Sequence, residues 1–209
     1  MVPALARLDH VIRYVTDIEA AHRESLANGL EAWPIGPFWP DALTSGIAVG
    51  GFNLELIQEE EPTTPLGIPC LAFEPTSLAV AEDRFRDCGI EFNRFEKIES
   101  DPALLRLRGF SETVSATPQP ICTNLAPRDS EALPFEFFLC GYAPFLRAWL
   151  SPDHPRFAAL PRVNRILYGT PDVVGARQLL DALGYAGGVE IEFVDADHRG
   201  VVGPLLVMA

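Results

Sequence analysis

An internal repeat constrains this chain more than any other feature. A short apolar strand, a helix with a polar first residue and a closing glycine recur three times along its 209 residues. The first copy is Leu8–Val15, followed by a capping-box pattern at Thr16 and Glu19 and a stop at Gly29. No GxGxxG sequence follows the first strand, so a dinucleotide-binding Rossmann unit is excluded. The repeat predicts similar modules that bury their apolar faces together.

The order of elements within the first two copies predicts a βαβββ module. In the first copy, strands at Thr44–Val49 and Phe52–Gln58 flank Gly50-Gly51, which is a hairpin signal. The second copy begins near Gly67, and its helix follows Thr76-Ser77. The apolar residues of this helix share one face: Leu78, Ala81, Phe85 and Cys88. The strands expected around this helix are Ile68–Phe73, Ile90–Phe95, Leu104–Phe110 and Phe135–Cys140, and the Pro-, Ser- and Thr-rich stretch Ser111–Leu133 is expected to hold most of a long loop.

The third copy is shorter. Val163–Leu167 is expected to be its first strand, and Thr170 to Val173 predicts a helix start with Pro171 at the first helical position and a stop at Gly184. Strands at Val189–Val194 and Val201–Met208 complete it. This copy lacks counterparts of the polar residues discussed below, so we expect it to have a structural role.

These patterns together predict an α+β fold. Repeated βαβββ modules form a curled mixed sheet with a concave cleft, and an abbreviated third module is added. The expected boundaries are 1–62 and 65–143 for the two modules, 144–161 for a linker and 162–209 for the third module. Within the linker, Phe145–Leu150 predicts a short amphipathic helix that packs on the modules or on another subunit of a homodimer.

Composition excludes some functions. A formal net charge of −13 argues against a nucleic-acid partner, since phosphate binding needs clustered Lys and Arg. No stretch is apolar for the roughly 20 residues that a membrane helix needs, and the first residues are too quickly polar for a signal peptide. The four cysteines show no CxxC spacing. We therefore expect a cytoplasmic protein with reduced thiols.

Several short motifs resemble those of a known superfamily. Leu8-Asp9-His10-Val11 and Leu54-Glu55-Leu56-Ile57 resemble the first-strand and fourth-strand motifs of the glyoxalase, or vicinal-oxygen-chelate, superfamily, in its glyoxalase-like domain branch. Leu133–Phe138 and Asp153-His154-Pro155 are similar to later parts of that branch. The resemblance implies paired modules around a cleft, where many members bind a divalent metal. Members include lyases, epimerases, ring-cleaving dioxygenases and non-catalytic drug-binding proteins, so the fold alone does not give the function.

Strand alternation singles out two carboxylates. Side chains alternate between the faces of a strand, so Glu55 lies opposite Leu54 and Leu56, and Glu136 lies opposite Phe135 and Phe137. A carboxylate between apolar neighbours is costly unless it is paired, hydrogen-bonded or bound to a metal. Either residue could act as a base if burial raises its pKa toward neutrality.

The resemblance implies that these two carboxylates belong to a candidate metal site with two further residues. His10 stands at the first-strand ligand position and Cys70 at the matching position of the second module, which gives His10, Glu55, Cys70 and Glu136 as candidate ligands. Imidazole and carboxylate suit Zn, Mn, Ni or Fe, and a thiolate favours Zn. Metal-using members more often carry His, a carboxamide or a carboxylate where Cys70 stands. The alternative is a metal-free pocket in which His10 hydrogen-bonds a carboxylate.

Other residues are candidates for substrate contact. Arg106 and Arg108 could hold an anionic group, or form a solvent-facing polar row. Trp39 could belong to an aromatic rim for an apolar ligand, or cover the open end of a module. Phe138 shares its strand face with Glu136.

Three functions are consistent with these features. The first is an enzyme, a lyase or isomerase that acts on a small oxygen-bearing molecule with a divalent metal in the cleft. The second is a non-catalytic protein of the same fold that binds or sequesters a small molecule. The third is a structural module whose extra unit completes a dimer. The enzyme reading expects His10, Glu55 and Glu136 to converge, whereas the binding reading expects them to lie apart or to bond with one another.

Overall fold

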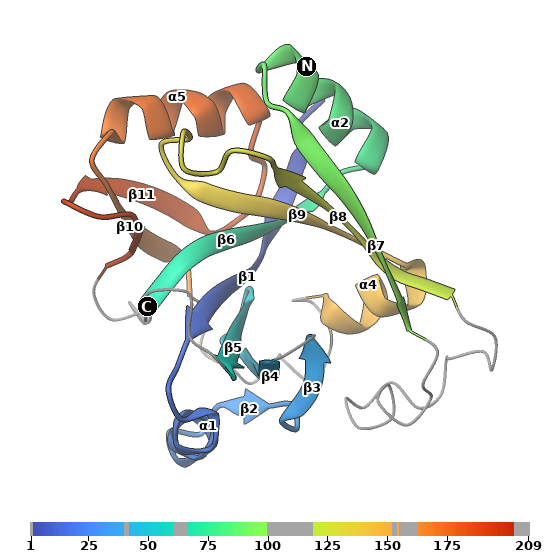
Figure 1. Cartoon of the computed structure of the whole chain (residues 1–209), viewed down its shortest axis with the longest axis vertical. Coiled ribbons are helices and arrows are strands. Elements are labelled where there is room, and N and C mark those ends of the chain that lie inside the picture. Colours follow the sequence, from blue (N-terminus) through green and yellow to red (C-terminus); the bar gives the residue numbers. More distant parts are fainter. Residues whose placement is uncertain are drawn as a thin grey trace.

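The computed structural model describes residues 2–39, 42–60, 67–99, 119–151, 154 and 163–202. Their main feature is a curled, nine-stranded mixed sheet (Figure 1). Its strands are β1 (Leu5–Tyr14), β2 (Glu31–Ala32), β3 (Gly36–Trp39), β4 (Ala42–Ala48), β5 (Asn53–Glu59), β6 (Gly67–Pro75), β7 (Phe92–Glu99), β8 (Gln119–Pro127) and β9 (Glu136–Tyr142). The order across the sheet is β2-β4-β5-β1-β6-β9-β8-β7, with β3 paired to β4.

The two halves of this sheet repeat one arrangement. In the first half, the opening strand β1 pairs in parallel with β5, and in the second half the opening strand β6 pairs in parallel with β9. The opening strands β1 and β6 pair antiparallel at the centre and join the halves. Gly50 (φ 70°) and Gly51 (φ 133°) form the predicted turn between β4 and β5, in conformations that glycine adopts readily. The predicted α+β class with a curled mixed sheet is confirmed.

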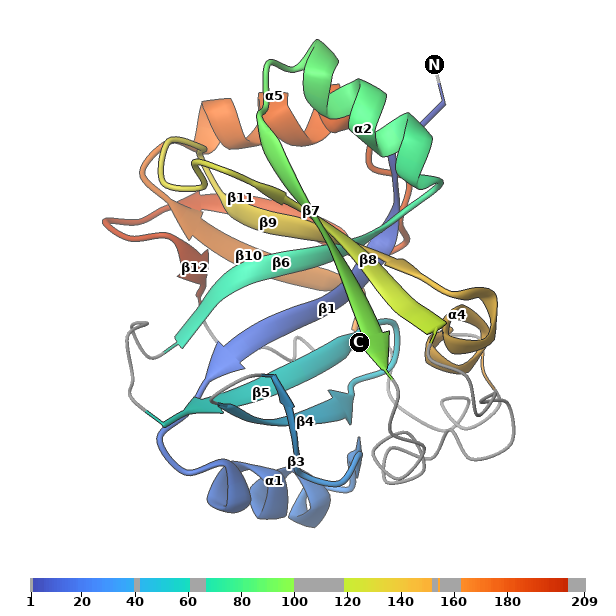
Figure 2. The ribbon, with the colours of Figure 1, turned by 45° about the vertical axis from the view of Figure 1, so that its right-hand side comes forward.

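Helices α1 (Ile18–Ala27), α2 (Leu78–Asp87) and α5 (Val173–Leu183) cover one side of the sheet, and the short helix α4 (Pro144–Leu150) packs on the other. Helix α1 packs on β4 and β5, and α2 packs on β6. Helix α5 lies beside α2 (Figures 1 and 2). Helix α4 packs against β9, and its Leu146 joins Ala72 and Cys140 in a small apolar cluster. The predicted segment Phe145–Leu150 is thus helical.

Side chains alternate between the two faces of the sheet as the sequence pattern predicts. Leu54, Leu56, Phe137 and Leu139 lie in the main core under the helices. Phe138 instead contacts the smaller clusters on the other face of the sheet. This second face is the concave side that positions the candidate site.

The third unit, residues 163–202, forms a separate three-stranded sheet but shares the main core. Its strands β10 (Arg165–Thr170), β11 (Glu190–Asp195) and β12 (Gly200–Val201) have the order β11-β10-β12, and β10 pairs in parallel with β11. The ring centroids of Tyr168 and Phe193 lie 6.2 and 5.1 Å from that of Phe135, the residue before β9. The unit is therefore packed onto the second half of the large sheet.

Two predicted helix starts are wrong by one residue or more. Asp17, not Thr16, caps α1, because its carboxylate accepts a hydrogen bond from the Ala20 amide at 2.8 Å. Asp172 caps α5 in the same way, so Pro171 lies before the helix rather than at its first position. Thr170 remains in β10, where it pairs with Asp195.

Strand β8 was not expected, since Ser111–Leu133 reads as loop. Residues 119–127 pair with β7 on one side and β9 on the other, and Ile121 and Leu125 are buried. Pro120 lies beside a register shift in the ladder with β7, where a residue without an N–H is tolerated. The predicted strand Leu104–Phe110 and most of Val201–Met208 lie outside the described residues.

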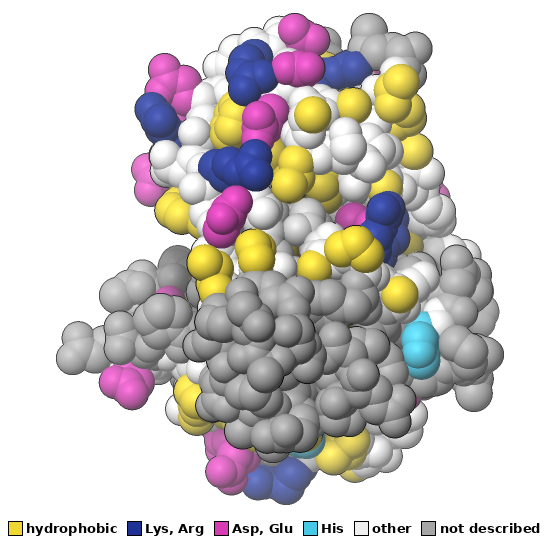
Figure 3. All heavy atoms as spheres, turned by 90° about the vertical axis from the view of Figure 1, so that its right-hand side faces the viewer, with side chains coloured by type: hydrophobic (Ala, Val, Ile, Leu, Met, Phe, Trp, Pro, Cys, Tyr) yellow, Lys and Arg dark blue, Asp and Glu magenta, His cyan; other side chains and the backbone are white. Residues whose placement is uncertain are grey.

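The described surface mixes charges of both signs. In the upper part of the face shown in Figure 3, basic and acidic side chains lie next to one another. Ion pairs on α2 and β7 are of this kind, with Arg86 bonded to Asp83 at 2.7 Å and Arg94 to Glu82 at 2.6 Å. None of the described helices is long and apolar enough to span a membrane.

Candidate functional site

A cavity of about 570 Å³ opens on the concave face of the large sheet. Its lining is mainly apolar and comes from both halves of the sheet and from the segment after β8. The apolar and aromatic lining includes Ile12, Tyr14, Ile57, Phe95 and Phe138, and the polar lining consists of Glu96, Lys97, Asn124, Ser130 and Glu136. Of the predicted site residues, Cys70, Glu136 and Phe138 line it. Cavities of this size and polarity are typical of small-molecule sites.

Of the two carboxylic acids that line this cavity in the described residues, Glu136 has the surroundings better suited to proton transfer. It lies at the start of β9, and its backbone N–H donates to the Tyr168 hydroxyl at 3.0 Å. Burial raises the pKa of its carboxyl group; the charge of Arg199 offsets part of this rise and that of Glu131 adds to it. A carboxyl group with a raised pKa in an apolar cavity is a better proton-transfer group than an ordinary solvated carboxylate.

Cys70 lies directly across the β6–β9 ladder from Glu136. Burial raises the pKa of its thiol, and the negative charge of Glu136 raises it further. The thiol therefore stays protonated, and a protonated thiol is a poor metal ligand and nucleophile.

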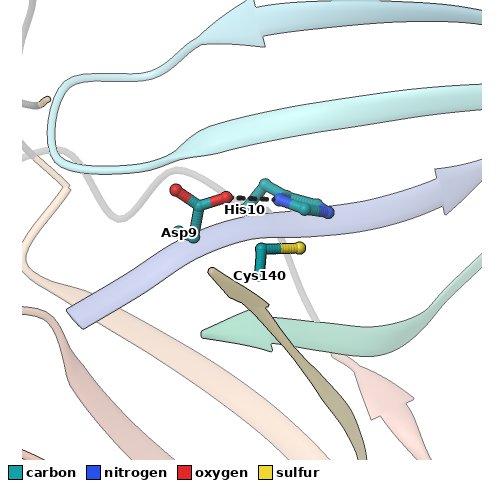
Figure 4. Close-up of side chains that lie close together, drawn as sticks. All are labelled: Asp9, His10 and Cys140. Atoms are coloured by element: carbon teal, nitrogen blue, oxygen red, sulfur yellow. Dashed lines mark hydrogen bonds and ion pairs between the residues drawn. The ribbon is translucent and has the colours of Figure 1, made fainter. Parts of the chain in front are cut away.

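A bulge in β1 brings two consecutive polar side chains together. Leu8 pairs with Phe73 and His10 with Ala72, so Asp9 is an extra residue between two consecutive pairs. Figure 4 shows Asp9 and His10 of β1 beside Cys140 of β9, with the hydrogen bond between the first two. Without the bulge, strand alternation would direct Asp9 and His10 to opposite faces.

Asp9 is fully buried and is held by three donors. It accepts hydrogen bonds from His10 Nδ1 at 2.7 Å, from the Tyr142 hydroxyl at 2.5 Å and from Arg7 Nη2 at 3.0 Å. Burial alone would raise the pKa of Asp9. The hydrogen bond from His10 and the charges of His10 and Arg7 outweigh burial and lower it, so the carboxylate is charged.

His10 lies between two carboxylates. Its Nε2 atom is 3.2 Å from Glu55 Oε2, and its ring meets Phe138 edge-on with centroids 5.5 Å apart. Burial alone would lower the pKa of the imidazole, but the hydrogen bond to Asp9 and the charge of Glu55 raise it. Asp9, His10 and Glu55 thus form a buried acid–base network that touches the cavity wall through Phe138.

The four predicted metal ligands share the concave face but are arranged as two pairs. Glu55, Cys70 and Glu136 lie in one row across the sheet, with Ile12 between Glu55 and Cys70. His10 lies two pairs along β1 from this row, opposite Ala72. The His10 side chain contacts that of Glu55, with Nε2 3.2 Å from Oε2, and Cys70 lies opposite Glu136. Among the described residues, the group of three whose ligand atoms lie within 4.8 Å of one another is Asp9, His10 and Cys140.

In each group, at least one candidate ligand is hydrogen-bonded or held protonated in this conformation. Asp9 already accepts three hydrogen bonds, and burial raises the pKa of the Cys140 thiol well above its usual value. In the predicted set, the ligand atoms His10 Nε2 and Glu55 Oε2 lie 3.2 Å apart. Metal binding by all four residues stays a prediction.

The remaining predicted residues fall largely outside what is described. Arg106 and Arg108 lie outside the described residues, as does the side chain of Trp39 in β3. Sequence analysis also missed several site residues: Asp9, Asn124, Tyr142 and Arg199. Asp9 stands next to His10 in the first-strand motif, but nothing in the sequence reveals the bulge that turns it toward His10.

Comparisons with known proteins give structural neighbours. No family model and no curated protein sequence matches the chain. A hypothetical protein from Staphylococcus aureus matches with a TM-score of 0.65 at 8% identity, over 96% of this chain and 88% of its own. A mutant of 4-hydroxymandelate synthase from Streptomyces coelicolor matches with a TM-score of 0.58 at 15% identity, over 94% of this chain and 64% of its own. Methylmalonyl-CoA epimerase from Mycobacterium tuberculosis matches with a TM-score of 0.50 at 17% identity, over 71% of this chain and 95% of its own.

The chain has the glyoxalase, or vicinal-oxygen-chelate, fold. At these identities the likeness concerns the fold and not the reaction. It confirms the fold that the short motifs around His10 and Glu55 imply. The function has to be argued from the cavity of this chain.

Proposed function

We propose that this protein is a small-molecule enzyme, an isomerase or lyase, in which Glu136 transfers a proton. One observation carries the proposal: a carboxyl group with a pKa raised by burial lines a largely apolar cavity of about 570 Å³. General acid–base catalysis is most effective when the pKa of the group lies near the working pH. The fold, which this chain shares with an epimerase, is compatible with this chemistry.

The proposed step starts from a carbon acid. Glu136, as carboxylate, removes a proton from a carbon next to a carbonyl group and returns it to the enolate on another face or atom. Asn124 is the candidate to stabilise the enolate oxygen. Its amide oxygen accepts a hydrogen bond from Cys122 Sγ at 2.9 Å, and Asn124 lines the cavity. The NH₂ group is therefore the part of this side chain that we propose as the donor to the enolate.

The lining supports an apolar substrate without a large negative charge. The described lining carries one basic residue, Lys97, and two acidic residues, Glu96 and Glu136. The aromatic ring of Phe138 is proposed to contact the substrate. The roles of Trp39, Arg106 and Arg108 in substrate binding stay predictions from the sequence.

A divalent metal is a separate proposal. Zn, Mn, Ni or Fe in the cleft would polarise a substrate oxygen. His10 and Glu55 are its strongest candidate ligands, since the Asp9 carboxylate holds His10 Nδ1 as carboxylates often hold metal-ligating histidines. The proton transfer by Glu136 does not depend on it.

Elemental analysis of protein purified without chelator tests the proposal of a bound metal. Near-stoichiometric metal is expected in the wild type, and its loss is expected in His10→Ala.

A non-catalytic binding protein is the second candidate. The supporting observation is that Asp9, His10 and Tyr142 hydrogen-bond with one another instead of pointing their polar atoms into the cavity. Such a protein would bind an apolar molecule in the same cavity and leave it unchanged.

Deuterium incorporation separates the two candidates. A panel of enolisable carbonyl compounds is incubated with the protein in D₂O, and exchange at carbon is followed by NMR. The enzyme reading predicts exchange that Glu136→Gln slows by about 10²–10⁴-fold, the usual contribution of a general base. Glu96→Gln is the matched control, because Glu96 also lines the cavity but is exposed, and it should change the rate less than about threefold. Equal rates in Glu136→Gln and the wild type would refute the role of Glu136.

A further inference from the structure

The third unit contacts the segment that carries one cavity-lining residue and leads into another. This segment, residues 128–135, joins β8 to β9, and it presents Ser130 and leads directly into Glu136. Three side chains of the third unit bond to it in succession along the chain: Arg199, Thr170 and Tyr168.

Arg199 makes the most specific of these contacts. Its Nη1 donates to the Ser130 carbonyl oxygen at 3.0 Å, and its Nη2 donates to the carbonyl oxygen of Glu131. A planar guanidinium with two donors fixes the direction of both carbonyl groups, which a single ammonium cannot do.

Thr170 and Tyr168 hold the end of the segment. The Thr170 hydroxyl donates to the Pro134 carbonyl oxygen at 2.5 Å, and the Tyr168 hydroxyl accepts from the Glu136 amide. Both residues are fully buried, so these bonds are shielded from competition with water. The position of the Glu136 backbone thus depends on a residue of the third unit.

We infer that the third unit shapes the cavity, with Arg199 as the positioning residue for segment 128–135. This inference rests on the proposed function only in that the cavity binds a small molecule. It assigns to the third unit a role in ligand binding in addition to its packing in the core.

Arg84 provides a matched control for a purely structural role. It also bridges two backbone carbonyl groups of distant segments, with Nη1 donating to Ala182 at 2.8 Å and Nη2 to Val2 at 3.3 Å. It lies on α2 and does not line the cavity.

The first test needs no ligand. Amide hydrogen–deuterium exchange of residues 128–136 is compared in wild type, Arg199→Met, Arg199→Lys and Arg84→Met. Faster exchange of this segment in Arg199→Met, with a smaller effect in Arg199→Lys and none in Arg84→Met, is expected. Unchanged exchange in Arg199→Met would overturn the inference.

The second test measures binding of the neutral fluorophore N-phenyl-1-naphthylamine. Arg199→Met should raise its Kd by roughly tenfold, the effect expected when hydrogen bonds that fix a cavity wall are lost. Arg84→Met should leave the Kd within about twofold even where it lowers the melting temperature equally. An equal loss of affinity in both variants, or none in Arg199→Met, would show that the contacts of Arg199 serve stability alone. If Glu136→Gln leaves carbon exchange intact while Arg199→Met still weakens fluorophore binding, the proposed reaction fails and this inference stands.

Discussion

Asp9 is a fully buried carboxyl group and Glu136 a half-buried one, and their environments are opposite. Asp9 has three hydrogen-bond donors, which lower its pKa, whereas Glu136 lies in an apolar cavity that raises its pKa. The first is suited to hold a charge and to orient His10, and the second is suited to exchange a proton. Strand alternation predicts the face of Glu136, but the environment of Asp9 arises from a bulge and from Arg7 and Tyr142, which the sequence does not connect to it.

Substitution of Asp9 should be costly. Asp9→Asn removes a buried charge that pairs with Arg7 and His10, and we expect it to lower the free energy of unfolding by about 3 kcal/mol. Urea denaturation measures this change. Asp83→Asn is the control, because Asp83 is exposed and pairs with Arg86 on the surface, and its cost should stay below about 1 kcal/mol. If Asp9→Asn lowered the free energy of unfolding as little as Asp83→Asn does, Asp9 would not stabilise the fold through its contacts with Arg7 and His10.

The pKa of His10 gives a pH-dependent prediction. Because its folded-state pKa is raised, the imidazolium stabilises the fold fully below the unfolded-state pKa of about 6.5, and this contribution is lost as the pH rises through the folded-state pKa. The difference in the free energy of unfolding between wild type and His10→Gln should therefore shrink as the pH rises above about 6.5. A difference that stays constant over this range would mean that His10 is not charged in the folded protein.

At the scale of elements, local signals predicted some features and missed others. Helix α2 follows from the Ser77 cap and its apolar stripe, and both Ala81 and Phe85 are buried. Strand β8 was missed because prolines at 120 and 127 indicate loop, although they lie near the two ends of the strand. The faces of Glu55 and Glu136 follow from alternation, but their distance from His10 depends on the register between strands, which alternation alone does not give.

At the scale of the whole molecule, one core joins the three units. The ring of Phe135, the residue before β9, contacts those of Phe137 in β9 and of Tyr168 and Phe193 in the third unit. The sequence predicted the third unit as a copy, but its packing depends on long-range contacts that a repeat pattern does not specify.

Truncation of Phe135 tests this shared core. Phe135→Ala should lower the free energy of unfolding by about 3–5 kcal/mol, because the side chain is fully buried, and the protein should still unfold in one calorimetric transition. Phe95→Ala, at a side chain that is 55% exposed, should cost below about 1 kcal/mol. Two separate transitions in the wild type would show that the third unit folds independently.

The central claim is that Glu136 is a carboxyl group whose pKa is raised by its position in a ligand cavity. An NMR titration of ¹³C-labelled glutamate side chains tests it directly, with Glu136→Gln and Glu96→Gln used to assign the two resonances. We predict that the Glu136 carboxyl titrates clearly above the ordinary glutamate value of about 4.3, because burial disfavours its charged form. A titration midpoint at or below this ordinary value would contradict the assignment of Glu136 as the acid–base group.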